Sequence, residues 1–158
     1  MTAGPANQPL LDEVNAADLW FHARKSRPIW VREIAQDQVI ETLEGTEHVP
    51  AGNMLCRGEA GDLWPQTRER LHQKYSPTRE YRDVWQKFVP HPDNQGVLAA
   101  CIEHPFSVTA AWGILHGKAG DYLLKNYQDR DLPYPDDVWI VDQSLFRSTY
   151  QHVVGPRD

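Results

Sequence analysis

The chain has 158 residues and a formal net charge of −6, and 41% of its residues are hydrophobic, 10% aromatic and 24% charged. This composition is too apolar for a disordered chain and too polar for a membrane protein, so we expect a soluble globular protein. Lys and Arg are scattered along the sequence, whereas a nucleic-acid-binding protein usually carries a basic face. Nucleic acid is therefore disfavoured as a partner.

The N-terminus and the cysteines suggest a location. No stretch approaches the roughly 20 apolar residues that span a bilayer. Residues 1–9 lack the charged head and apolar run of a secretory signal. Cys56 and Cys101 lie far apart without CxxC spacing, which favours reduced core thiols. We expect a cytoplasmic protein without a membrane partner.

Hydrophobic spacing predicts the elements along the chain. After a flexible tail at 1–8, the spacing of Leu10, Val14 and Phe21 is typical of an amphipathic helix. In chain order we predict a helix at 9–24, strands at 29–34, 39–43 and 53–57, a short helix at 67–75, a helix at 77–88, strands at 97–102, 107–112 and 121–125, and a short helix at 142–150. Glycines between the strands read as turn residues.

The sequence also suggests an internal repeat. Residues 28–58 align with 96–126 without a gap at an offset of 68, and the alignment resumes after about seven extra residues within 127–138. The matched positions include Gly45 with Gly113, His48 with His116, Trp64 with Trp139, and Tyr75 with Tyr150. Such matches in order predict two diverged copies of one unit.

The predicted fold is α+β, with two pseudo-symmetric β-rich repeats at 9–76 and 77–158. Each repeat would hold a helix, short strands and a helical turn, with the junction at Pro77–Arg79. Units of about 70 residues are at the edge of what folds alone, so we expect one core with a bent sheet or small barrel. Duplication within one chain suggests a homodimeric ancestor, which favours a monomer or weak dimer now.

Several segments resemble a known family. Residues 119–124 read Ala-Gly-Asp-Tyr-Leu-Leu, Tyr-Pro follows at 134–135, and 144–150 read Ser-Leu-Phe-Arg-Ser-Thr-Tyr. With Ile-Glu-Thr-Leu-Glu-Gly at 40–45, these segments resemble the PGDYG-type family of small bacterial and phage proteins. The chain departs from the family pattern with Asn53 in place of Asp and Lys118 in place of Pro. The resemblance implies a fold unit and carries over no catalytic residue.

His48 and His116 are the first candidates for chemistry, because they match across the repeat. Facing each other across a shared cleft, they could be metal ligands or an acid–base pair. Two ligands are too few for a zinc site, and a third from Glu47, Cys56, Glu103 or His104 would have to converge. We favour turn histidines that bond the backbone, and we predict no metal site.

The remaining candidates are an acid and several aromatic residues. Asp121 is a possible general base, but its match Asn53 cannot accept a proton, so a shared turn-capping role is favoured. Most tryptophans read as core residues. Trp112, Tyr122 and Tyr134 are the candidates for contacting a ligand.

The extra loop at 127–137 breaks the predicted symmetry. Four Asp residues within it allow a Ca²⁺ site, although the EF-hand spacing is absent. We favour a solvated, semi-rigid loop.

No dinucleotide, P-loop, serine-elbow or CxxC motif is present in the sequence. We expect a non-catalytic binding module without a cofactor, which takes a small molecule or a protein partner at the seam between the repeats. One alternative is an enzyme with a His/Asp acid–base site at the same seam. The other is a PUA-like RNA-type binder, by analogy of fold.

Overall fold

The computed structural model describes residues 4–153, which form helices and short antiparallel strands. The helices are α1 (Gly4–Ala16), α2 (Arg68–Lys74) and α3 (Gln143–Thr149), with a 3₁₀ turn at Tyr127–Asp129. The strands are β1 (Phe21–Lys25), β2 (Ile29–Glu33), β3 (Gln38–Thr42), β4 (Gly45–Val49), β5 (Met54–Arg57), β6 (Leu63–Gln66), β7 (Tyr75–Arg82), β8 (Trp85–Pro90), β9 (Val97–Cys101), β10 (Phe106–Ala110), β11 (Gly113–Gly117), β12 (Tyr122–Asn126), β13 (Val138–Val141) and β14 (Tyr150–His152).

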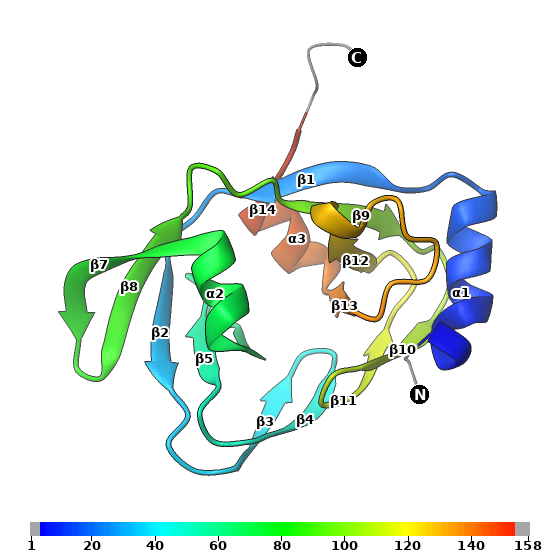
Figure 1. The fold of residues 1–158 in the computed structure, drawn as a ribbon. Coiled ribbons are helices and arrows are strands. Elements are labelled where there is room, and N and C mark those ends of the chain that lie inside the picture. Colours follow the sequence, from blue (N-terminus) through cyan, green and yellow to red (C-terminus); the bar gives the residue numbers. More distant parts are fainter. Residues whose placement is uncertain (1–3, 154–158) are drawn as a thin grey trace.

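These strands form two five-stranded sheets and two hairpins. The first sheet has the order β6-β5-β2-β8-β7, and the second has the order β13-β12-β9-β1-β14. The hairpins β3–β4 and β10–β11 lie at one end of the two sheets (Figure 1). The α+β prediction is confirmed. The alternative of a small barrel is wrong, because both sheets are open among the described residues.

The two sheets have the same pattern of pairing. Ile29 of β2 faces Phe88 of β8, and Val97, 68 positions after Ile29, faces Ala23 of β1. The two hairpins likewise span 38–49 and 106–117. Below, "equivalent" positions are those 68 apart up to residue 126, or 75 apart where the later residue is 138 or beyond.

The first strand of each half lies in the sheet of the other half. β1 pairs with β9 and β14 in the second sheet, and β8 pairs with β2 and β7 in the first. The hairpin β7–β8 therefore completes the first sheet although it crosses the predicted junction at 77–79. Through this exchange, β1 lies in the sheet formed mainly by the C-terminal half, and each sheet contains strands from both halves of the chain.

The predicted helix at 77–88 is wrong, because this segment is the hairpin β7–β8 with a turn at Asp83, which has a φ of +54°. β8 pairs with β2, and this pairing buries Phe88. The packing gained in the sheet decides for a strand, although the spacing of apolar residues in this segment also fits a helix. Pro77 is tolerated because β7 is an edge strand.

The predicted helix at 9–24 is displaced. α1 begins at Gly4, so residues 4–8 are helical rather than a flexible tail, and residues 1–3 lie outside the described residues. The helix ends at Ala16, and Asp18, with a φ of +53°, turns the chain into β1. In contrast, the two predicted short helices are confirmed as α2 and α3. Each has a side-chain N-cap, because Thr67 accepts from Arg70 N and Asp142 accepts from Ser144 N.

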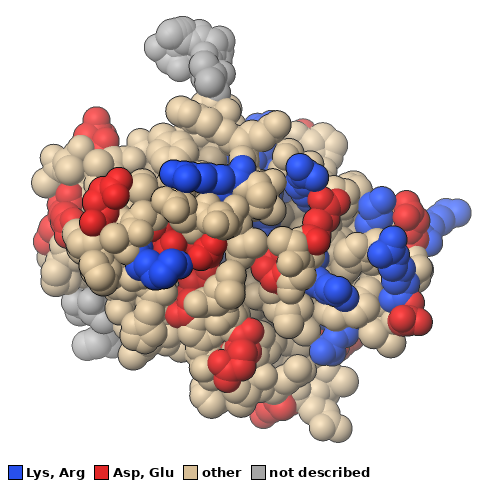
Figure 2. All heavy atoms as spheres, turned by 180° about the vertical axis from the view of Figure 1, so that it is seen from behind, with Lys and Arg blue, Asp and Glu red and all other residues tan. Residues whose placement is uncertain are grey.

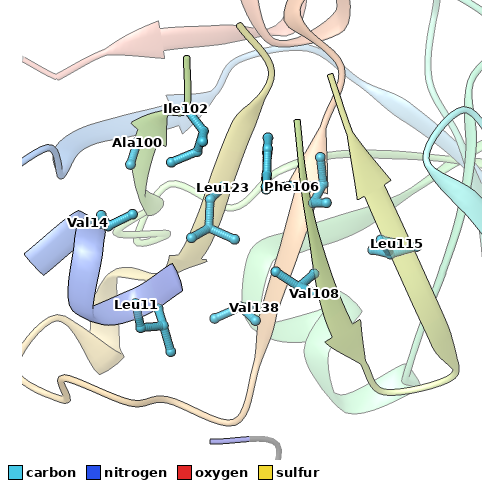
Figure 3. Close-up of a cluster of buried hydrophobic side chains, with 10 residues drawn as sticks. Leu11, Val14, Ala100, Ile102, Phe106, Val108, Leu115, Leu123 and Val138 are labelled. Carbon is cyan, nitrogen blue, oxygen red and sulfur yellow. The ribbon is translucent and has the colours of Figure 1, made fainter. Parts of the chain in front are cut away.

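The core is divided among several clusters. Leu11 and Val14 of α1 point toward Leu123 in the cluster that joins α1 to the second sheet and β10–β11 (Figure 3). A separate cluster on the first sheet contains Ile29, Leu71 and the other buried residues Val31, Met54, Cys56, Tyr75 and Phe88. Because each sheet has its own cluster, the space between the sheets does not have to be filled by core side chains.

Both cysteines are free thiols, as predicted. Cys56 is fully buried, but Cys101 is only partly buried and is therefore not a core residue. Among the described helices, none is both long enough and apolar enough to cross a membrane.

Candidate functional site

A cavity of about 480 Å³ lies between the two sheets. Its walls come from β6 and β13, from α2 and α3, and from the two hairpins. This volume is in the range of sites for small organic molecules, which are typically 300–1,000 Å³.

The walls of the cavity come largely from equivalent positions. Both members of these pairs line it: Leu63 and Val138, Trp64 and Trp139, Pro65 and Ile140, Gln66 and Val141, Arg70 and Leu145, Lys74 and Thr149, Tyr75 and Tyr150, Thr42 and Ala110, Leu43 and Ala111, Glu44 and Trp112, Glu47 and Leu115. The cavity is therefore located where equivalent strands and helices of the two halves meet.

The two halves differ in the chemistry of these pairs. The charged members are Glu44, Glu47, Arg70 and Lys74, and their equivalents are Trp112, Leu115, Leu145 and Thr149. The N-terminal half thus contributes the charged member of each such pair, and the C-terminal half contributes mainly apolar walls.

Two lysines form a basic end of the cavity. Lys25 Nζ lies 3.6 Å from the ring centroid of Trp64, and Lys74 Nζ lies 4.7 Å from that of Trp139. Within residues 4–153, neither ammonium group makes an ion pair with a carboxylate. Indole faces attract cations, but they do not neutralise the charge. Asp62 lines the cavity and its charge acts on Lys25, but it makes no ion pair with it, so the two ammonium groups have no directly bound anion among the described residues.

Burial changes the ionisation of both lysines. Burial lowers the pKa of Lys25 to about 8, although the charge of Asp62 acts in the opposite direction. The pKa of Lys74 is lowered to about 7, mainly by burial and in part by the charges of Arg70 and Lys25. Arg70 itself pairs with Asp137. Lys74 therefore has the larger neutral fraction of the two lysines near pH 7.

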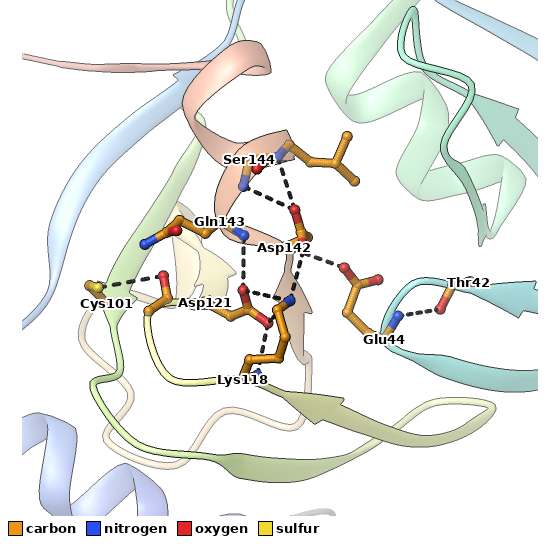
Figure 4. Close-up of polar contacts among 10 residues, drawn as sticks. Thr42, Glu44, Cys101, Lys118, Asp121, Asp142, Gln143 and Ser144 are labelled. Carbon is orange, nitrogen blue, oxygen red and sulfur yellow. Dashed lines mark hydrogen bonds and ion pairs between the residues drawn. The ribbon is translucent and has the colours of Figure 1, made fainter.

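Glutamates define the opposite, acidic end. Glu47 is 8% exposed, and no hydrogen bond or ion pair holds its carboxylate within the described part of the chain. Burial raises the pKa of Glu47 to about 7, with a smaller effect from the charge of Glu44. Unlike Glu47, Glu44 has a hydrogen-bond partner, because its carboxylate accepts a hydrogen bond of 2.9 Å from Asp142 N (Figure 4).

His48 and His116 do not face each other. His48 N donates to Trp112 O at 3.0 Å and His116 N donates to Glu44 O at 2.7 Å, so β4 and β11 run antiparallel. The histidines are at opposite ends of this contact, four residues apart, which is roughly 13 Å at 3.3 Å per residue.

Both histidines are on strands rather than in turns, and their side chains are exposed and outside the cavity walls. His116 Nδ1 lies 2.8 Å from Ser107 Oγ, so this ring contacts a side chain rather than the backbone. In residues 4–153, no three His, Cys, Asp or Glu side chains are placed to hold a metal ion.

Asp121 is a buried structural acid. Its carboxylate accepts hydrogen bonds of 2.9 Å from Lys118 N and from Gln143 N, and it pairs with Lys118 Nζ at 3.1 Å (Figure 4). At the equivalent turn, Pro50 has no N–H, and Asn53 instead donates to the Pro50 carbonyl at 3.0 Å. Asp121 therefore caps N–H groups of its turn, as favoured, whereas Asn53 bonds a carbonyl, so the predicted sharing of this role by the two halves is wrong. Asp121 does not line the cavity.

The predicted ligand-contacting aromatics are in three different places. Trp112 lines the cavity. Tyr122 stacks on Phe146 with 4.0 Å between ring centroids, outside the cavity walls. Tyr134 is exposed and donates a hydrogen bond to the Asp12 carboxylate of α1, which ties the loop at 127–137 to that helix.

Sequence reasoning did not place Lys25 or Lys74 in a site, and it considered Glu47 only as a possible third metal ligand. A signal for two of them existed in the sequence, because Lys74 is equivalent to Thr149 and Glu47 to Leu115, so both are positions where the aligned halves differ. Lys25 had no such signal, because its position in the cavity depends on the exchange of β1 into the second sheet.

The surface gives no competing basic site on the face in Figure 2, where Lys and Arg side chains alternate with Asp and Glu instead of forming one patch. Comparisons of the chain with protein-family models, with curated proteins and with solved structures give no match.

Proposed function

We propose that the chain is a binding module for a small organic anion with a flat apolar body, held in the cavity between the two sheets. The observation that carries this proposal is the pair of ammonium groups, Lys25 and Lys74, over Trp64 and Trp139 without an ion-pair partner in residues 4–153. A carboxylate, sulfonate or phosphate would supply the missing charge, and the indoles would contact the apolar body.

The proposal includes an origin for the site. The shared strand order and register support a chain of two diverged copies of one β-rich unit, each resembling the PGDYG-type family. In a symmetric ancestor, the cavity would have had two identical walls. Divergence then left most of the charges on the N-terminal wall and mainly apolar residues, apart from Asp137, on the other, as a site for an asymmetric ligand requires.

The other candidate functions have less support. An acid–base enzyme at His116 and Asp121 would need both residues near a common cavity, and neither lines this one. An RNA binder would need a continuous basic surface, and the net charge of −6 opposes it. A concave space of about 480 Å³ is of the size that takes a small molecule and is not a feature that a protein partner needs.

The test is binding of 8-anilinonaphthalene-1-sulfonate, a flat aromatic anion with a fluorescence readout. The double variant Lys25→Met, Lys74→Met is expected to bind it at least about tenfold more weakly, because charge-assisted contacts contribute roughly 1.5–3 kcal/mol each. Lys87→Met is the matched control, because Lys87 is outside the cavity and pairs with Glu80.

The control variant should bind like the unmodified chain. Equal affinity of the double variant and the unmodified chain would contradict the proposal, since the dye would then bind to some other apolar surface.

A further inference from the structure

The second, acidic end of the cavity has a feature that anion binding does not use. The Glu47 side chain is more than nine-tenths buried, lines the cavity, and has no hydrogen-bond or ion-pair partner among residues 4–153. Burial of a carboxylate without a protein partner has a cost, and the Glu47 oxygens are not fully enclosed, so they reach the cavity, where a cationic group of a ligand can contact them. At the equivalent position Leu115 packs in the core without this cost.

We infer that Glu47, Glu44 and Trp112 form a second subsite for a protonated amine, so that the ligand is dipolar, with an anionic group at one end and an ammonium group at the other. This inference rests on the proposed function, because it assigns the opposite end of the same cavity. Both carboxylates can accept hydrogen bonds from an ammonium group, and the Trp112 indole offers a face for cation–π contact.

The fold holds these three residues at one place. Gly113, next to Trp112, has no Cβ, and a Cβ there would overlap the Thr46 carbonyl and lie 3.5 Å from Glu47 Cα. The backbones of the two hairpins can therefore approach closely, and they bring Trp112 beside Glu47. The His48 N to Trp112 O hydrogen bond of 3.0 Å fixes the same approach.

The two ends of the cavity are electrically distinct. The charges that act on Lys25 and Lys74 come from Asp62, Cys56, Arg70, Asp129 and each other, whereas the charge that acts on Glu47 comes from Glu44. The lysines therefore do not neutralise Glu47. A ligand that satisfies both ends has to carry its opposite charges apart, on a spacer that fits the cavity lined by Trp64 and Trp139.

Matched probes test the second subsite. The 4-(ω-aminoalkyl)benzoates with one to three methylene groups carry both charges, and the 4-alkylbenzoates of the same length carry the anion alone. By calorimetric titration, at least one amino compound is expected to bind about tenfold or more tightly than its alkyl counterpart. Glu47→Gln is expected to remove this advantage and to leave the affinity for the alkylbenzoate within about twofold.

Glu80→Gln is the control, because Glu80 is exposed and outside the cavity. Glu47→Leu, which copies the equivalent residue Leu115, serves where the Gln variant folds poorly. The inference is overturned if the amine adds nothing while alkylbenzoates bind, a result that leaves the proposed function intact. It is also overturned if the advantage of the amine survives in both Glu47 variants. Absence of binding by every probe contradicts the inference and the proposed function together.

Discussion

Replacing Gly113 by alanine is expected to lower the free energy of unfolding by about 3 kcal/mol, the upper part of the range for overpacking a tight contact. The added Cβ would overlap the carbonyl oxygen of Thr46, and a backbone atom cannot move aside as a flexible side chain can. The hairpins β3–β4 and β10–β11 would have to separate. Urea denaturation at neutral pH measures the effect.

The reciprocal residue gives a sharper form of this prediction. A Cβ on Gly45 would lie 2.7 Å from Ile114 O, on the other side of the same contact. Because one separation of the hairpins relieves both overlaps, Gly45→Ala and Gly113→Ala together should cost less than the sum of the single variants. Gly61→Ala is the control: a Cβ there meets no described atom within 4 Å, and only its φ of +86° is unfavourable. Stability of Gly113→Ala equal to that of the unmodified chain would mean that the hairpins do not approach as described.

Replacing Lys74 by methionine is expected to stabilise the protein at pH 7, by about 2 kcal/mol after allowance for partial exposure of the side chain. The folded state lowers the pKa of Lys74 from 10.5 to about 7, mainly by burial. The unfolded chain therefore binds more protons between these values. The cost to the folded state is full below about pH 7 and disappears as the pH rises toward 10.5.

The gain in stability of Lys74→Met over the unmodified chain should follow this pH dependence. Denaturation curves at pH 7 and at pH 10.5 measure it, with Lys87→Met as a control for replacing a lysine outside the cavity. A gain that is the same at both pH values would show that packing, and not ionisation, distinguishes Met from Lys. Since the same lysine is proposed to bind the ligand, the stabilised variant should be the weaker binder, as is common where a site retains an unpaired charge.

Much of the fold could be predicted from the pattern of the sequence. The predicted strands at 29–34 and 97–102 correspond to β2 and β9, and the predicted short helices at 67–75 and 142–150 correspond to α2 and α3. The pattern could not locate β4 and β11, because Gly45 and Gly113 read as turn residues. In the structure these glycines begin strands, where their lack of a Cβ permits the close approach of the two hairpins.

The hairpin β7–β8 was mistaken for a helix for a different reason. The spacing of Tyr81, Trp85 and Phe88 fits both a helical face and paired strands, and the pairing with β2 that decides between them is a long-range contact. The exchange of β1 and β8 between the sheets is also long-range, and it has no counterpart in local sequence.

The candidate site was predictable in its location but only partly in its residues. The seam between the matched halves and the residue Trp112 follow from the repeat and from the departure between its halves. The histidines were chosen because they match, but both lie outside the cavity, whereas the cavity has charged residues at positions where the aligned halves differ. Lys74 and Glu47 are such positions.

The central claim is that a flat anion binds between the equivalent strands β6 and β13. The six tryptophans test it directly, because Trp64, Trp112 and Trp139 line the cavity and Trp20, Trp30 and Trp85 do not. In a titration of the ¹⁵N-labelled protein with 8-anilinonaphthalene-1-sulfonate, the indole N–H signals of the first three should move and those of the other three should stay in place. Movement confined to Trp20, Trp30 and Trp85 would contradict the claim.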